Sequence, residues 1–333
     1  MNLAGYCQGT HEHLPEEQRK AQRSAIRLQI VTVVYTVVTI VLVVLVMGSS
    51  QAMKTAWIED MLSLLPQLAF FIALFFIRKP SSVRHPYGQH RAMGIGHLVA
   101  GVALLTVGAS LVVQSSISLI TAEHPTIGTV TLFGEAVWLG WLMIAVMAVT
   151  AVGPPILGRM KAKVAAKLHN KVLFADADMM KADWHTNIAT ILGVFGVGIG
   201  LWWLDATAAI VISVGIIADG LRNTKSALAD LMDRRARTYD GEEPHPVTRS
   251  VLRVARDATW AQEAGVRVRD QGQVLHIELF VVPALNHVEL EWFGPLIDAV
   301  RDIDWKIHDV VIVPTDPLPP YADTDKQVSR GRP

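Results

Sequence analysis

Long apolar runs fill the first two thirds of this 333-residue chain. A helix needs about 20 predominantly apolar residues to cross a bilayer, and six runs approach or exceed that length. They cover about residues 26–47, 55–77, 93–120 and 135–157, a stretch that begins after residue 171 and ends at 204, and residues 206–217 with a weaker extension to 223. The pattern predicts a polytopic α-helical membrane protein with a six-helix transmembrane bundle over residues 26–223.

Lysine and arginine are unevenly distributed among the connections of these runs, and cytoplasmic connections carry the excess of positive charge. The basic residues gather before the first run, between the second and third, and between the fourth and fifth, as Arg19, Lys20, Arg23, Arg27, Arg78, Lys79, Arg84, Arg91, Arg159, Lys161, Lys163, Lys167 and Lys171. The other connections hold almost none beyond Lys54. Both termini are therefore predicted to be cytoplasmic, including an N-terminal segment of residues 1–25, and we expect the plasma (inner) membrane as the location.

The last third of the chain has the composition of a soluble protein. Residues 224–247 are polar and contain Gly241-Glu-Glu-Pro-His-Pro, which is typical of a linker. Residues 248–316 show the order helix, strand, strand, helix, strand, which predicts a small cytoplasmic α+β domain (αββαβ, ferredoxin-like). The tail, residues 317–333, is rich in Pro, Asp and Arg and is expected to be disordered.

Ionisable side chains inside two of the apolar runs define a candidate site, because each costs about 2.5–3.5 kcal/mol to insert into a membrane. The candidates are Glu59, Asp60, Ser63, Lys181, Asp183 and His185. The i,i+4 spacing places Glu59 with Ser63, and Lys181 with His185, on one helix face. Carboxylates and a neutral imidazole suit a divalent cation, so Glu59 and His185 are the predicted metal ligands. The alternative is that these are ordinary charged residues at helix ends, paired with one another or with lipid headgroups.

Several short segments, together with this six-helix plan and αββαβ domain, resemble the cation diffusion facilitator family of metal/proton antiporters. His85-Pro-Tyr-Gly-Gln-His-Arg-Ala is similar to the motif that follows the second helix of that family. Ala175-Asp-Ala-Asp-Met and Trp203-Leu-Asp-Ala-Thr-Ala-Ala resemble its fifth helix and the turn into its sixth. Asp230-Leu-Met-Asp-Arg resembles the Leu-Leu-Asp signature that closes the membrane domain. The resemblance covers about residues 20–315 and is specific only as an ensemble.

The resemblance implies a secondary active transporter that exports a divalent metal ion of the zinc, manganese or iron class from the cytoplasm in exchange for protons. Protons would return on His185 or a carboxylate, since the unperturbed pKa of histidine is about 6.5. The implied partners are a second copy of the chain, through the cytoplasmic domains, and the lipid bilayer, with no nucleic acid. In the family, the positions of Arg91 and Asp233 form a charge interlock. The alternative is that Asp233 pairs with neighbouring arginines.

The transport site departs from the family pattern. The aligned positions are Glu59, Ser63, Lys181 and His185, and a protonated lysine has no lone pair to offer a metal. Asp60 and Asp183 lie one and two residues away from aligned positions and could compensate. Two rival functions follow: a non-transporting membrane regulator or sensor with the same fold, and a transporter of another cation with Lys181 as the proton carrier. An enzyme is least favoured, because the sequence shows no nucleophile–base pair.

Weaker metal candidates lie outside the bundle. His85 occupies the basic connection after the second run, and His276 and Glu278 alternate on the second predicted strand of the domain, which places them on one face. At the end of the last strand, where the family often has a histidine, this chain reads Val311-Ile-Val-Pro-Thr-Asp. The alternative is that these histidines are solvated surface residues.

Overall fold

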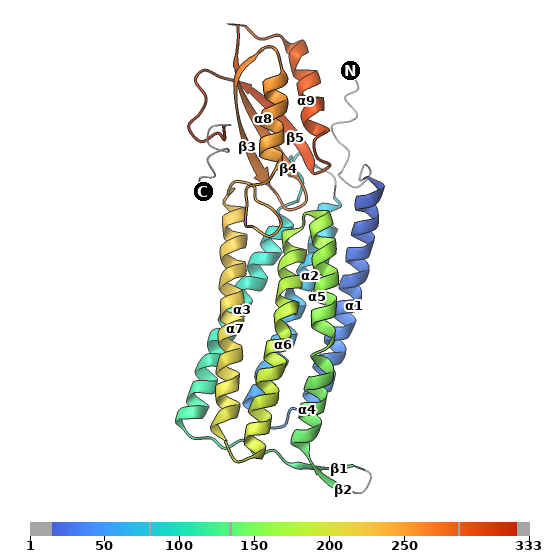
Figure 1. The fold of residues 1–333 in the computed structure, drawn as a ribbon, viewed down its shortest axis with the longest axis vertical. Helices are drawn as coiled ribbons and strands as arrows, with labels where there is room; N and C mark the ends of the chain where they lie inside the picture. The colour runs from blue at the N-terminus through green and yellow to red at the C-terminus, as the bar shows by residue number, and fades with distance from the viewer. Residues whose placement is uncertain (1–14, 80, 133–134, 286, 325–333) are drawn as a thin grey trace.

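The structure, a computed structural model, describes residues 15–79, 81–132, 135–285 and 287–324, without the side chains of residues 132, 181 and 182. Long helices run alongside one another below a small domain that contains a sheet (Figure 1). They are α1 (Glu16–Val46), α2 (Gln51–Ile77), α3 (Ala92–Ile120), α6 (Lys171–Gly198), α7 (Trp203–Leu231), and α4 (Leu139–Thr150) followed end to end by α5 (Gly153–Leu168). Large apolar side chains such as Val34, Phe75 and Val211 cover the outside of this bundle, as expected of helices that face lipid.

Within the described residues, five spans are long and apolar enough to cross a membrane: α1, α2, α3, α4 with α5, and α7. The sequence predicts six, and α6 falls outside this set because its first half carries charged residues, including Asp176 and Asp183. It nevertheless packs against α2, α4, α5 and α7 within the bundle. Helix α6 is therefore part of the bundle, with neighbouring helices packed along it.

The fourth span differs from its predicted bounds of 135–157. Residues 135–138 form β2 (Glu135–Trp138), which pairs antiparallel with β1 (Thr129–Leu132) at the end of the bundle opposite the sheet domain (Figure 1). The helix breaks after Thr150, where Gly153 and Pro154 start α5, because proline has no amide hydrogen to continue the helical ladder. Since α5 then runs on to Leu168, much of the basic segment predicted as a connection is helical.

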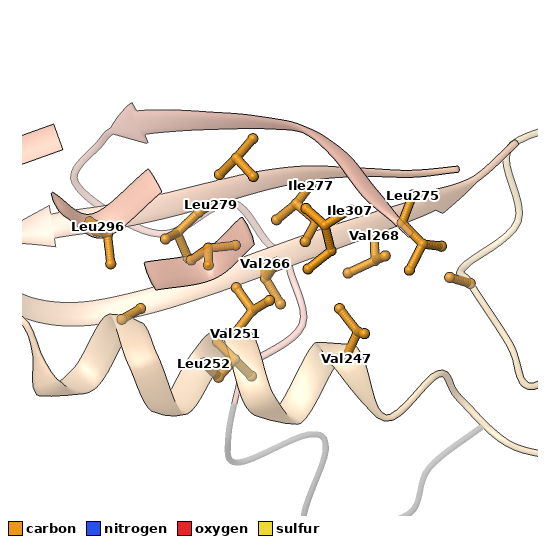
Figure 2. Packing of buried hydrophobic residues seen from close by; sticks show 14 of the residues in the cluster. Val247, Val251, Leu252, Val266, Val268, Leu275, Ile277, Leu279, Leu296 and Ile307 are labelled. Atoms are coloured by element: carbon orange, nitrogen blue, oxygen red, sulfur yellow. The ribbon is translucent and has the colours of Figure 1, made fainter. Parts of the chain in front are cut away.

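The C-terminal domain consists of α8 (Val247–Asp257), β3 (Ala261–Asp270), β4 (Leu275–Pro283), the short 3₁₀ helix η2 (Leu290–Trp292), α9 (Phe293–Arg301) and β5 (Ile307–Pro314). This is the αββαβ order predicted from the sequence. The sheet order is β3-β4-β5, with β3 and β4 antiparallel and β4 and β5 parallel. Its core joins Val251 and Leu252 of α8 to Leu275, Ile277 and Leu279 of β4 (Figure 2).

The segments on either side of this domain are more ordered than the sequence predicts. Helix α7 continues to Leu231, and in the predicted linker the Ala236 amide donates to the Val268 carbonyl over 3.1 Å. Residues 317–324 of the predicted disordered tail pack on β3, where the backbones of Val266 and Asp323 exchange two hydrogen bonds of 2.9 and 2.7 Å. Ala322 is buried over Gly265, which has no side chain to obstruct it. The remainder of the tail, and residues 1–14, lie outside the described residues.

Candidate cation site in the helix bundle

A small cavity of about 20 Å³ lies among α1, α2, α4, α5 and α6. A cavity needs about 10–15 Å³ to hold one water molecule, so this one has the size for a single water or a single small ion. Its lining consists of Tyr35, Thr36, Thr39, Ala56, Glu59, Asp60, Ser63, Gln67, Met147, Thr150, Pro154, Met180, Asp183, Thr186 and Asn187.

The α2 side of the cavity carries two neighbouring carboxylates, those of Glu59 and Asp60. Glu59 Oε1 accepts a hydrogen bond of 3.1 Å from Thr186 Oγ1 on α6. Among the described residues, the other oxygen, Glu59 Oε2, is buried with no hydrogen-bond partner. The Ser63 hydroxyl donates to the Asp60 backbone carbonyl over 2.7 Å. The residues expected on the second run therefore face the cavity, and one carboxylate oxygen is available for a ligand.

The α6 side is formed by Asp183, Thr186 and Asn187, which share one face because they are spaced i, i+3 and i+4. Asn187 Nδ2 donates to the Asp183 backbone carbonyl over 3.1 Å. His185 is exposed and does not line the cavity, and its ring lies 3.9 Å from that of Trp184 between centroids. The structure thus brings Asp183, and not His185, to Glu59. The Lys181 side chain lies outside the described part of the chain.

The chemistry of the lining is that of oxygen ligands. It combines three carboxylates with hydroxyl and amide groups and the thioethers of Met147 and Met180, and no imidazole, thiolate, lysine or arginine is among these lining residues. Oxygen ligands of this kind suit hard cations such as Mg²⁺, Ca²⁺ and Mn²⁺. Across the described residues, no three His, Cys, Asp or Glu side chains already stand in position to hold a metal ion. A cation here would take neutral oxygens as ligands, or draw the carboxylates together.

A buried ion pair lies seven residues before Asp183 on α6, an interval of about 10 Å along a helix. Lys161 Nζ is 2.6 Å from Asp176 Oδ2, and both side chains are almost fully buried. Gln29 Nε2 of α1 donates to the same carboxylate over 3.0 Å. Sequence reasoning missed this pair because it placed Lys161 in a connection. The available signal is helical periodicity, since Lys161 falls on one face with the buried residues Pro154, Gly158 and Ala165.

The expected pair of Arg91 and Asp233 is present where the bundle meets the sheet domain. Arg91 Nη2 donates to Asp233 Oδ1, and its Nη1 donates to the Leu231 carbonyl at the end of α7 over 2.9 Å. Asp233 has a φ of 59°, a left-handed conformation that often ends helices. Arg234 pairs with Asp230 instead of with Asp233, at 3.0 Å.

A second, more deeply buried link joins the same two parts. Lys171 Nζ lies 3.2 Å from Asp230 Oδ2 at the end of α7 and 3.0 Å from Asp270 Oδ2 at the end of β3. Burial acts to raise the pKa of Asp270, but the ammonium groups of Lys306 and Lys171 outweigh it and hold that pKa below its usual value. This network connects the membrane helices to the sheet.

The weaker metal candidates are scattered. His85 is exposed on the loop between α2 and α3. Glu278 is engaged by the guanidinium groups of Arg267 and Arg269. His276 lies beside Asp309, with 3.6 Å between Nδ1 and Oδ2. The structure therefore gives His276 and Glu278 different partners.

Comparison with known proteins agrees with this architecture. The family model of the cation efflux transmembrane domain matches residues 28–232. The manganese efflux system protein MneS of Bacillus subtilis (strain 168) is 24% identical over 235 residues, 70% of this chain and 73% of MneS. Metal tolerance protein 7 of Oryza sativa subsp. japonica is 25% identical over 228 residues, 68% of this chain and 54% of that protein. Because the family match spans more than half of its length, this chain belongs to the cation efflux family, the cation diffusion facilitators.

Proposed function

We propose that this protein is a secondary active transporter that exports a hard divalent cation of the manganese class from the cytoplasm in exchange for protons. The observation that carries the proposal is the cavity between α2 and α6, where Glu59, Asp60 and Asp183 face a space the size of one ion. Its lining offers carboxylate, hydroxyl and amide oxygens and no imidazole or thiolate, which favours manganese over zinc, since zinc accepts imidazole and thiolate ligands readily. The relative MneS, named as a manganese efflux system protein, supports the same substrate class.

Proton exchange follows from the same carboxylates. Several carboxylates close together and out of water cannot all remain charged unless a cation accompanies them. A divalent cation must displace protons to bind carboxylates, and protons replace the cation when it leaves. The carboxylates of Glu59, Asp60 and Asp183 are therefore our proposed proton carriers, in the place that the sequence suggested for His185.

In this proposal α6 is the sixth membrane crossing. Asp176 and Asp183 of this helix are turned toward its neighbours and the cavity, which keeps these two carboxylates away from lipid. Both termini would lie in the cytoplasm of a cell whose plasma (inner) membrane holds the protein. Two copies would pair through their C-terminal domains, as the family resemblance implies. The ferredoxin-like character of that domain and the boundaries at residues 26–223, 224–247 and 248–316 belong to this proposal too.

The test is the flux of Mn²⁺ into inside-out vesicles that contain the full-length protein, with and without an imposed proton gradient. We expect gradient-dependent uptake in the wild type and a loss of at least about tenfold in Glu59→Gln or Asp183→Asn, the lower end of what altered metal shells cost. His185→Gln is the matched control on the same helix and should retain flux. Wild-type flux in both cavity variants would reject the cavity. Flux of zinc without manganese would reject the substrate class, and flux that ignores the gradient would reject antiport.

A further inference from the structure

The break between α4 and α5 deprives one backbone carbonyl of its usual helical donor. In an uninterrupted α-helix the Thr150 carbonyl would accept the amide of residue 154, but that residue is Pro154, which has no amide hydrogen. The Tyr35 hydroxyl of α1 donates to this carbonyl over 2.6 Å. Because Thr150 is buried, its carbonyl needs such a partner within the protein. A side chain from another helix therefore satisfies the carbonyl that the proline frees.

This hydrogen bond lies at the wall of the cation cavity. Tyr35, Thr150 and Pro154 all line the cavity, alongside the three carboxylates that we propose for the cation. The Thr150 hydroxyl also lies 3.5 Å from the Oδ1 atom of Asn187, another lining residue, on α6. Thr150 thus contacts α1 through its carbonyl and α6 through its side chain.

The break is shaped to receive the Tyr35 ring. A β-carbon on Gly153 would lie 2.4 Å from the Cζ atom of Tyr35 and 2.6 Å from its hydroxyl oxygen, which is far closer than a van der Waals contact. The glycine therefore makes room for the phenol, and Pro154 leaves the carbonyl free for its hydroxyl. Two features of the α4–α5 break serve the same side chain.

A cation in this cavity needs neutral oxygen ligands. Among the described residues, no three His, Cys, Asp or Glu side chains stand together in position to hold a metal ion. Manganese and similar hard cations favour about six oxygen ligands, so the carboxylates leave part of that shell to other groups. A carbonyl adds an oxygen without adding a negative charge to a buried site. Broken membrane helices of transporters commonly present such carbonyls to cations.

We propose that the Thr150 carbonyl is a ligand of the transported cation, and that the Tyr35 hydroxyl holds this carbonyl while the cation is absent. This inference rests on the proposed function, since the cation is the proposed cargo. When the cation binds, it takes the place of the phenol hydrogen at the carbonyl. When the cation leaves, the hydrogen bond forms again and removes the cost of a buried, unpaired carbonyl. The fourth span thereby contributes to a site that the sequence placed on two other spans.

The first test is Mn²⁺ binding by the purified full-length protein, measured by equilibrium dialysis with the metal alone. Tyr35→Phe keeps the ring and removes the donor that competes with the cation. Its Mn²⁺ should bind about two- to tenfold more tightly than that of the wild type, the factor that one hydrogen bond supplies. The variant should also melt at a lower temperature than the wild type in EDTA. A purely structural tyrosine would lower the melting temperature without tightening Mn²⁺ binding, and that result would overturn the proposal.

The second test restores the missing helical donor. Pro154→Ala supplies an amide that competes with the cation for the Thr150 carbonyl, so Mn²⁺ binding should weaken by about two- to tenfold. Pro155→Ala is the matched control, because its amide would serve the Ala151 carbonyl and neither residue is among the described lining residues. A cooperative melting transition in EDTA identifies the variants that fold. Equal Mn²⁺ affinity in the two folded proline variants would contradict the role of the carbonyl.

Glu59→Gln, measured in the same dialysis, separates this inference from the proposed transport site. If Glu59→Gln loses Mn²⁺ binding while Tyr35→Phe and Pro154→Ala bind it as the wild type does, the cavity stands and the Thr150 carbonyl is not a ligand. If Glu59→Gln binds Mn²⁺ as the wild type does, the cavity is not the transport site and both proposals fail. Tighter binding in Tyr35→Phe together with weaker binding in Pro154→Ala is the result that we expect.

Discussion

Two residues of α6 that are only two positions apart have different surroundings. Successive residues of an α-helix are rotated by about 100°, so Asp183 and His185 point to opposite sides of it. Asp183 faces the cavity with Glu59, while His185 is exposed on the outside beside Trp184. Sequence reasoning favoured His185 because imidazole suits a divalent cation and because the residue lies at a position aligned with the family's site. The cavity instead presents oxygen ligands, which within the expected zinc, manganese or iron class suit manganese best.

His245 provides a pH prediction at the same scale. Burial, with smaller contributions from Lys306 and His169, lowers the pKa of His245 to about 4. Its Nδ1 accepts the Val247 amide at the start of α8, which only the unprotonated nitrogen can do. Since the unfolded chain has a pKa of about 6.5, it binds the proton more tightly than the folded one does. Stability is therefore complete above about pH 6.5 and falls as the pH drops toward 4.

The measurement is the thermal unfolding of the purified protein at pH 7.5 and at pH 5. His245→Asn should flatten the fall between these two pH values, because an asparagine oxygen can accept the same amide and does not titrate. His85→Asn, on an exposed loop, should leave the fall unchanged. An equal fall in His245→Asn would mean that other groups cause the acid sensitivity.

At the scale of elements, α5 shows why a basic segment can be part of the bundle. Residues 159–168 are mostly lysine, alanine and other good helix formers, and the helix ends only at His169, in the left-handed conformation. Asn170 then caps α6 by accepting the Leu173 amide over 2.9 Å. Because the helix continues, Lys161 falls on its buried face, where its ammonium group pairs with Asp176.

Breaking this buried pair should be costly. Lys161→Met leaves the Asp176 carboxylate buried with no ammonium, and removing one partner of a buried pair typically costs about 3–5 kcal/mol. We expect a large drop in the melting temperature of the detergent-solubilised protein. Replacing both residues, as Lys161→Met with Asp176→Leu, should recover most of it. Lys163→Met, on an exposed position of the same helix, is the control. A variant as stable as this control would show that water or lipid headgroups reach Asp176.

At the scale of the whole molecule, ionic contacts of Lys171, Arg91 and Arg269 lie where the bundle meets the sheet domain. Lys171, partly buried between Asp230 and Asp270, contacts both parts at once. The Arg91–Asp233 pair is more open, with 37% and 42% of the two side chains exposed. Exposed pairs contribute about 0–1 kcal/mol, so the more deeply buried link is the stronger candidate for holding the junction.

A double-mutant cycle tests this ranking. Arg91→Gln and Asp233→Asn, the latter chosen because asparagine tolerates the left-handed conformation, should show a coupling of at most about 1 kcal/mol in thermal unfolding. Lys171→Met should destabilise more than either. A coupling above about 2 kcal/mol would indicate that the Arg91–Asp233 pair is shielded from water, for example by a second copy of the chain.

Features that depend on local pattern were predictable from the sequence. Apolar runs predicted the membrane helices, because a segment in lipid must form its own backbone hydrogen bonds and present apolar side chains. The αββαβ order followed from amphipathic spacing and turn residues. The pairing of Arg91 with Asp233 was expected through the family resemblance and from the helix ends on which both lie. The inward face of α6, the burial of Lys161 and the packing of residues 317–324 were decided by tertiary structure. Each depends on a partner elsewhere in the chain, such as Gln29, which is 147 residues from Asp176. A charged side chain is buried only where such a partner compensates it, and that partner is known only once the helices have packed.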